Sequence, residues 1–259
     1  MMIKTNGIDT WYDVTGAGPW LVLSHSLACN SHMWDPQMAE LTKRFKVLRY
    51  DTRGHGQTEA PAGAYTLDTL ADDAKALFDA LGVKDPHWCG LSMGGMIGQT
   101  LALKYPGVAK SLVLADTTSR YPPEAAALWM DRIRMAQEKG MGALVEGTLS
   151  RWFTDPYRAA HPDVMKQVGG WIAATPVAGY AGCCHALPQI NVTDRLKEIK
   201  VPALVIVGEQ DMGTPPAMAR AIHEGLPGSR LVVIPSAAHL SNMEQPAAFT
   251  RALLDFLPK

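Results

Sequence analysis

The sequence predicts an α/β fold in which helices flank a mostly parallel central sheet and a helical cap is inserted in the second half. Three observations lead to this prediction. Short apolar runs of strand length alternate with segments whose apolar residues recur at helical spacing. Turn-forming residues separate these segments. The alternation stops between residues 118 and 194 and resumes after them. Strands alternating with helices are typical of βαβ units, whose parallel strands are covered on both faces.

Each predicted element of the first half has a local signal. Asn6-Gly7 between two short strand-like runs predicts a hairpin. Apolar runs predict strands over residues 20–24, 45–50, 86–92 and 110–115. Helical spacing predicts helices over residues 31–43, 67–81 and 93–104. Gly82 ends the second of these helices, because glycine readily adopts the left-handed conformation of a helix end.

The second half repeats the pattern after an interruption. Strands are predicted over residues 201–207 and 230–234, and helices over residues 217–226 and 247–257. Residues 118–194 lack a clear buried strand but contain three of the seven tryptophans, Trp129, Trp152 and Trp171. Helical patterning over residues 125–137 and 144–153 predicts a cap over one edge of the sheet. We therefore predict one compact unit, with a core of residues 1–117 and 195–259 and a cap of residues 118–194.

The composition excludes several classes of protein. Hydrophobic residues make up 47% of the chain and charged residues 19%, which excludes an intrinsically disordered protein. The 24 basic and 25 acidic residues give a net charge of −1, so the basic surface of a nucleic-acid-binding protein is not expected. No apolar run has the roughly 18 residues of a membrane span. The N-terminus lacks the apolar region of a secretory signal, and we expect a cytoplasmic protein.

Neither a metal nor an organic cofactor is expected. Cys183-Cys184-His185 resembles a metal cluster, but adjacent thiols lack the usual separation of zinc ligands. The chain contains no GxxxxGK[ST] phosphate loop, and no GxGxxG opens a helix after the first strand. The four cysteines form no CxxC motif, which favours reduced thiols in the cytosol.

The candidate nucleophile is Ser92. It lies at the centre of Gly90-Leu91-Ser92-Met93-Gly94, which matches GxSxG between a predicted strand and a predicted helix. A serine on such a tight turn needs small residues two positions before and two positions after it. Gly90 and Gly94 meet this requirement, and the turn would expose the serine hydroxyl at the top of the sheet.

The candidate acid and base are Asp211 and His239. A serine hydroxyl needs a base, and in one chain order of the Ser-His-Asp triad the acid and then the histidine follow the serine. Asp211 and His239 each come in a loop directly after a predicted strand. Since catalytic groups of open α/β sheets gather at the carboxyl ends of the strands, we expect both beside Ser92. Ser92 would attack the acyl carbon, His239 would transfer the proton, and Asp211 would orient the imidazole.

Two other acids compete for the role of Asp211. Glu209 lies two residues earlier, and Asp116 ends the predicted strand over residues 110–115. We expect Asp211→Ala to lower activity far more than Glu209→Ala.

The oxyanion hole is predicted from two backbone N–H groups. One belongs to Met93, directly after the nucleophile, and the other lies in the loop after the strand over residues 20–24. Leu27 is the preferred donor in that loop. Ser26 is the alternative, and its hydroxyl could make an additional hydrogen bond.

These motifs resemble the α/β-hydrolase superfamily over essentially the whole chain. Within that superfamily the sequence is most similar to the 3-oxoadipate enol-lactonases. The stretches that carry the resemblance are residues 47–56, 89–95, 151–153, 179–187 and 239–246. The resemblance implies that a small lactone with acidic groups, from aromatic catabolism, is hydrolysed through an acyl-enzyme without a cofactor.

The resemblance also implies residues that contact the substrate. Arg132 lies where enol-lactonases have a similar Trp…Arg-Ile stretch, which implies a ligand for a substrate carboxylate; a surface salt bridge is the alternative. Ser26, Trp129 and Trp152 are the other candidate substrate-binding residues.

Two stretches depart from the enol-lactonase pattern. Residues 25–28 read His-Ser-Leu-Ala where those enzymes often have Asn-Ser-Leu-Gly. Residues 188–191 read Pro-Gln-Ile-Asn where they tend to have Arg-Asp-Ala-Asp. The second stretch is expected to border the pocket and therefore bears on the choice of substrate.

Other functions are compatible with the same fold and triad. A general carboxylesterase of small esters is the main alternative, with perhydrolase or carbon–carbon bond hydrolase chemistry on the same triad. A non-catalytic binding protein is disfavoured because the three triad residues and the flanking glycines are all present. A homo-oligomer is left open.

Overall fold

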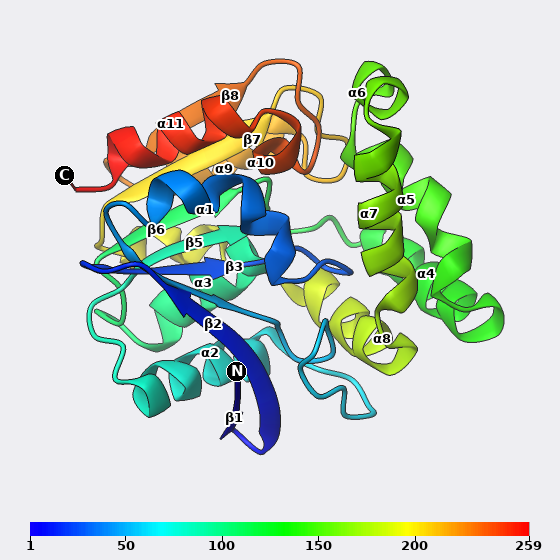
Figure 1. Ribbon diagram of the computed structural model, residues 1–259, viewed down its shortest axis with the longest axis horizontal. Helices are drawn as coiled ribbons and strands as arrows, with labels where there is room; N and C mark the ends of the chain where they lie inside the picture. Colours follow the sequence, from blue (N-terminus) through cyan, green and yellow to red (C-terminus); the bar gives the residue numbers. More distant parts are fainter. Residues whose placement is uncertain (259) are drawn as a thin grey trace.

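An eight-stranded sheet forms the centre of the molecule, for which the computed structural model describes residues 1–258 (Figure 1). Lys259, the last residue of the predicted core, lies outside the described residues. The strand order is β1-β2-β4-β3-β5-β6-β7-β8. The pairs β1–β2 and β2–β4 are antiparallel, and all other neighbours are parallel. The predicted mostly parallel sheet is confirmed.

The strands follow the predicted runs closely. They are β1 (Met2–Thr5), β2 (Ile8–Thr15), β3 (Trp20–Ser24), β4 (Lys46–Tyr50), β5 (His87–Leu91), β6 (Ser111–Ala115), β7 (Ala203–Gly208) and β8 (Arg230–Ile234). The hairpin of β1 and β2 turns at Asn6 and Gly7, which both have positive φ. Every residue of β5, β6 and β7 is buried, because helices pack on both faces of these strands.

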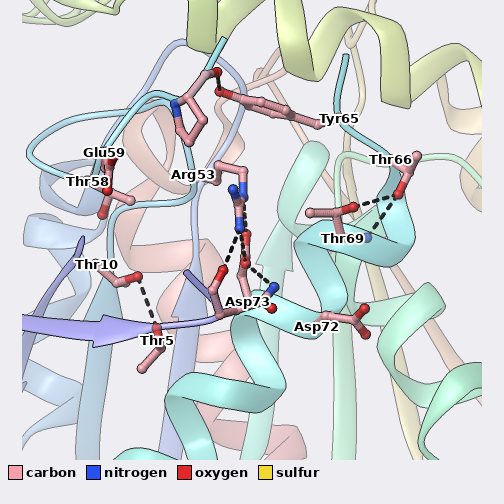
Figure 2. Close-up of polar contacts among 12 residues, drawn as sticks. Thr5, Thr10, Arg53, Thr58, Glu59, Tyr65, Thr66, Thr69, Asp72 and Asp73 are labelled. Atoms are coloured by element: carbon pink, nitrogen blue, oxygen red, sulfur yellow. Dashed lines mark hydrogen bonds and ion pairs between the residues drawn. The ribbon is translucent and has the colours of Figure 1, made fainter. Parts of the chain in front are cut away.

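Helices cover the parallel strands. The helix α1 (Asp35–Leu41) packs against α11 (Pro246–Phe256), and α2 (Leu67–Leu81) packs against α3 (Met93–Lys104). The helix α9 (Pro216–Gly225) contacts β7 and β8, and the short α10 (Ser241–Glu244) precedes α11. The limits of α2 are those predicted. The Thr66 hydroxyl accepts from the Thr69 N–H at its start (Figure 2). Gly82 is left-handed at its end.

The predicted helix over residues 31–43 is only partly correct. Residues Ser31–Trp34 form a 3₁₀ turn, and α1 covers Asp35–Leu41. Pro36 explains the division, because proline is tolerated only in the first turn of an α-helix.

The segment after β4 is anchored to α2. The Arg53 guanidinium donates to both carboxylate oxygens of Asp73, at 2.6 and 2.7 Å. The Asn6 side-chain amide donates to the same carboxylate at 2.6 Å, which links the first hairpin to the pair of Arg53 and Asp73. A paired arginine of this kind holds the loop after β4, in which Gly54 lies against the Gly179 backbone.

The helical segment between β6 and β7 lies beyond the carboxyl ends of the strands, at the right of Figure 1. We call it the cap. Its helices are α4 (Ala125–Lys139), α5 (Val145–Trp152), α6 (Asp155–Ala160), α7 (Pro162–Ala174) and α8 (Val177–Ala186), with 3₁₀ turns at Met141–Leu144, Leu187–Gln189 and Thr193–Glu198. The division of the chain at residues 118 and 194 stays a prediction. No helix within residues 1–258 has the length and apolar character to cross a membrane.

Candidate active site

Ser92 occupies a strained turn between β5 and α3. Its φ of 55° and ψ of −112° lie outside the regions that non-glycine residues favour. The Ser92 N–H donates to the Ala115 carbonyl at 2.8 Å, and the Thr117 hydroxyl donates to the Ser92 carbonyl at 2.7 Å. These bonds hold the turn from the neighbouring strand β6.

The flanking glycines are required by close backbone contacts. A Cβ atom on Gly90 would lie 2.1 Å from the Gly94 carbonyl oxygen. A Cβ atom on Gly94 would lie 2.2 Å from the Ser24 carbonyl oxygen. Both distances are far below van der Waals contact, so the GxSxG pattern has the steric cause expected from the sequence.

Asp211 and His239 are hydrogen-bonded to each other. The distance from His239 Nδ1 to Asp211 Oδ2 is 2.8 Å, and both side chains are buried. Asp211 Oδ1 accepts from the Gly213 and Thr214 N–H groups, while Oδ2 also accepts from the Thr214 hydroxyl. Burial alone would raise the pKa of Asp211, but His239 and these donors outweigh burial and lower the pKa below its usual value.

The hydrogen bond to Asp211 defines the role open to His239. An Nδ1–H that donates to the carboxylate leaves Nε2 as the acceptor nitrogen of the neutral ring. His239 and Ser92 line the same cavity. The arrangement can therefore perform the proton transfers of a Ser-His-Asp triad, with Ser92 as the nucleophile.

The rival acids are placed elsewhere. Glu209 accepts from the Ser236 N–H at 3.2 Å on an exposed turn. Asp116 is fully buried, where it accepts from the Gly208 N–H and the Ser241 hydroxyl. Burial, and then the charge of Asp211, raise the pKa of Asp116 well above its usual value. Among residues 1–258 neither acid is hydrogen-bonded to His239, which favours Asp211 as its partner.

The Leu27 N–H at the cavity and the Met93 N–H, directly after the cavity-lining Ser92, have no acceptor within the described part of the chain. The Ser26 N–H, by contrast, donates to the Met33 sulfur at 3.2 Å. This contrast favours Leu27 over Ser26 as the backbone donor of an oxyanion hole. The buried Ser26 hydroxyl has no partner in the described residues and remains able to donate.

His25 holds the loop after β3, which carries Leu27, and does not itself line the cavity. Its Nδ1 is 2.7 Å from the Ser26 carbonyl oxygen, and its Nε2 accepts from the Thr52 N–H at 2.9 Å. Burial lowers the pKa of His25 to about 4, so the ring is neutral near pH 7 and both bonds persist.

A cavity of about 610 Å³ opens over Ser92, between the core and the cap. Trp129 and Trp152 lie in its wall. The Trp152 ring stacks on the His239 ring, with centroids 6.2 Å apart. This volume is in the range of sites that enclose small-molecule ligands.

A sequence model of the family described as "alpha/beta hydrolase fold" matches residues 19–246. The chain belongs to the α/β-hydrolase family. It is 37% identical to 3-oxoadipate enol-lactonase 2 of Acinetobacter baylyi, across 91% of this chain and 87% of that relative.

Solved structures also support membership of the α/β-hydrolase family. The enol-lactonase from Burkholderia xenovorans LB400 superimposes with a TM-score of 0.96 and 39% identity, over the whole of both chains. A thermophilic esterase from Thermogutta terrifontis has a TM-score of 0.93 and 31% identity, and covers 98% of this chain and 96% of its own.

Two arginines of the cap line the cavity of this α/β hydrolase. Arg132 was a candidate from the sequence, and the structure places its guanidinium 4.8 Å from the Trp129 ring centroid. Arg151 was missed; its signal was only its place beside Trp152. Burial, and then the charge of Arg132, lower the pKa of Arg151. Neither arginine forms a salt bridge within residues 1–258, which disfavours the surface salt bridge considered for Arg132.

Glu244 is a second residue that sequence reasoning missed. One of its oxygens accepts from the N–H and hydroxyl of Thr154 in the cap, and the other accepts from the Ala238 N–H beside His239. The Leu240 N–H donates to the Trp152 carbonyl at 3.1 Å. The cap and the histidine loop are thus joined directly by hydrogen bonds.

No cluster of three or more His, Cys, Asp or Glu side chains suited to a metal occurs in residues 1–258. Cys183 and Cys184 are buried free thiols, and burial raises the pKa of both.

Proposed function

We propose that this α/β hydrolase opens a small anionic lactone, with an enol-lactone as the leading candidate, through an acyl-enzyme on Ser92. The observation that carries the proposal is the pair Arg132 and Arg151, which line the Ser92 cavity without a carboxylate partner among the described residues. Asp131 also lines the cavity but pairs with Arg134. Two neighbouring cations that form no salt bridge favour an anionic ligand. Two relatives named 3-oxoadipate enol-lactonase, at 37% and 33% identity, support this substrate class.

The first half of the reaction forms the acyl-enzyme. His239 Nε2 takes the hydroxyl proton as Ser92 Oγ attacks the lactone carbonyl carbon. The developing oxyanion accepts from the Leu27 and Met93 N–H groups, and Asp211 stabilises the imidazolium. The ring C–O bond then breaks, and His239 returns the proton to the departing oxygen.

The second half releases the product. A water molecule gives a proton to His239 and attacks the acyl carbon, and the Ser92 oxygen leaves with the proton that His239 returns. In an enol-lactone the departing oxygen is an enol, which tautomerises to a ketone and makes opening of the ring favourable. No step requires a metal or an organic cofactor.

The substrate carboxylate would bind between Arg132 and Arg151, while the Trp129 and Trp152 rings would contact the lactone ring. The test compares kcat/KM for 3-oxoadipate enol-lactone and for p-nitrophenyl acetate, with Ser92→Ala as the inactive control. We expect Arg132→Gln and Arg151→Gln each to lower the lactone-to-acetate ratio by about 10-fold or more, since a charged hydrogen bond contributes roughly 1.5–3 kcal/mol.

Arg134→Gln is the matched control. Arg134 lies on the same helix α4 but pairs with Asp131, and its side chain is exposed. Its loss is expected to leave the ratio unchanged. Equal loss of both activities in the Arg132 and Arg151 variants would contradict the proposal.

The second candidate is a carboxylesterase of small neutral esters. The similarity to the Thermogutta terrifontis esterase favours it, as does the tryptophan wall of the cavity. Higher turnover of p-nitrophenyl butyrate than of the lactone would support this candidate. Perhydrolase chemistry, with peroxide in place of water, uses the same acyl-enzyme and is tested by adding peroxide. The four free cysteines support the expectation of a cytoplasmic enzyme.

A further inference from the structure

A second cavity, of about 520 Å³, lies apart from the one over Ser92, and within residues 1–258 the two share no lining residue. The start of α2, the end of α3 and the segment between α8 and β7 form this second cavity. Residues 189–191 line it, whereas Leu187 is the last residue of that segment at the Ser92 cavity. The expectation that residues 188–191 border the substrate pocket is therefore wrong.

The inner lining of the second cavity is apolar, and its entrance is polar. Leu67, Leu103, Ile190 and Val192 are buried or half-buried. The exposed lining residues are Thr66, Asp68, Lys104, Gln189, Asn191 and Arg195. A cavity of this kind fits a small ligand that has an apolar body and a polar head.

The α2 and α3 sides of the cavity carry hydrogen-bond donors without a partner. Thr100 is only 9% exposed, and its hydroxyl forms no hydrogen bond with another described residue. At the start of α2 the Thr69 N–H donates to the Thr66 hydroxyl. The Leu67 and Asp68 N–H groups have no acceptor anywhere in residues 1–258. Unpaired N–H groups at the start of a helix, together with the helix dipole, favour an anion.

The charges at the cavity favour the same kind of ligand. Lys104 and Arg195 are positive, and among the described residues Asp68 is the one acid that lines the cavity. Lys104 also pairs with Asp72 at 2.7 Å. The pair of Arg195 with Glu198 is about half exposed on both sides. Because such exposed pairs contribute little, Arg195 remains able to bind a ligand.

We propose that this second cavity binds a small carboxylate anion with an apolar body, at a site separate from the catalytic one. The carboxylate would accept from the start of α2 and from Thr100. Lys104 lies one helical turn along α3 from Thr100, on the same face, and would add its charge. The apolar body would cover Leu103 and Ile190 and remove them from water. Binding here does not depend on the reaction at Ser92.

The test is a titration of the ¹⁵N-labelled enzyme with benzoate, followed by NMR. We expect the amide resonances of Leu67 and Asp68 to shift and to saturate, with a Kd on the order of 1 mM for so small a ligand. Benzamide has the same ring without the charge, and acetate has the charge without the ring. Each should bind about tenfold more weakly, because one lacks the charged hydrogen bonds and the other the apolar contact.

The variants Arg195→Gln and Thr100→Val should each raise the Kd for benzoate, by about tenfold for the charged residue. Valine has nearly the shape of threonine, so Thr100→Val should fold. Lys197→Gln is the matched control. Lys197 is an exposed cation on the same 3₁₀ turn as Arg195, but it does not line the cavity. Its loss should leave the Kd unchanged.

Three results would overturn the inference: shifts that do not saturate, benzamide binding as tightly as benzoate, and equal losses of affinity in Lys197→Gln and Arg195→Gln. Arg132→Gln separates this site from the proposed catalytic one. The shifts at the start of α2 should persist in that variant, and their disappearance would place the benzoate in the Ser92 cavity and refute the second site. The lactone-to-acetate ratio judges the proposed function independently, so either proposal can fail while the other stands.

Discussion

Replacing Asp211 by asparagine tests the proposed triad most directly. Asp211 Oδ1 accepts two backbone N–H groups, from Gly213 at 2.7 Å and from Thr214 at 3.0 Å. An asparagine in the same place must direct its carbonyl oxygen to these donors, since an amide NH₂ cannot accept. Its NH₂ then occupies the position of Oδ2, facing His239 Nδ1.

The magnitude follows from this geometry. A donor opposite Nδ1 makes that nitrogen the acceptor and moves the ring proton to Nε2. His239 then cannot take the Ser92 proton, although the packing is unchanged. We expect kcat to fall about 10⁴-fold, as expected for a triad histidine held in the wrong tautomer.

The assay is stopped-flow or steady-state hydrolysis of p-nitrophenyl acetate, with circular dichroism to confirm folding. Glu209→Gln and Asp116→Asn are the controls, because these are the other acids near the loop. In Asp116→Asn the oxygen can still accept from Gly208, and the NH₂ can donate to the Ser241 hydroxyl. We expect both controls to keep kcat within about threefold of the wild type, since neither changes the tautomer of His239. Asp211→Asn with more than about one-tenth of wild-type kcat would refute the assignment.

Four further substitutions test stability. Burial lowers the pKa of His25 and His55 from 6.5 to about 4 and about 3, so only the unfolded chain binds their protons as pH falls from 6.5 toward 4. The free energy of unfolding should therefore fall on acidification, by about 3 kcal/mol for His25. When this free energy is measured by urea titration at several pH values, it should fall less steeply with pH in His55→Asn than in the wild type. An equally steep fall would contradict this. Gly94→Ala should destabilise by about 3 kcal/mol through its clash with Ser24. Gly170→Ala, whose Cβ meets nothing within 4 Å, should stabilise by about 0.5–1 kcal/mol; similar melting temperatures would refute the steric argument. Glu244→Gln places an NH₂ against a buried donor and should lower stability by about 1–3 kcal/mol in calorimetry, and an unchanged melting temperature would show that these bonds contribute little.

Elements with a strong local signal were predictable from the sequence. The limits of β3, β8, α2 and α3 are those predicted, because a turn residue bounds each apolar pattern. The helix α8 gave no such signal. Residues 179–184 are buried on all sides of the helix, so apolar and small residues occur without an amphipathic period. Its limits depend on contacts with distant parts of the chain, which the local sequence does not contain.

The candidate site also contains residues that were predictable from the sequence and residues that were not. Ser92, Asp211 and His239 were predictable because each follows a strand, and parallel strands end at one edge. Arg151 was not predictable, since its importance depends on the absence of a carboxylate partner after folding. Glu244 was missed for a similar reason: its two partners, Thr154 and Ala238, lie in segments that only the fold brings together.

The cap contacts the proposed triad as well as forming part of the pocket wall. Trp152 stacks on His239, and its carbonyl oxygen accepts from the Leu240 N–H. Glu244 adds a second link, because one carboxylate bonds to Thr154 in the cap and to Ala238 in the histidine loop. A change in the cap that moves Trp152 must therefore also move the proposed base. For this reason substitutions in α5 should change kcat together with KM, whereas substitutions at the exposed face of α4 should act on KM alone.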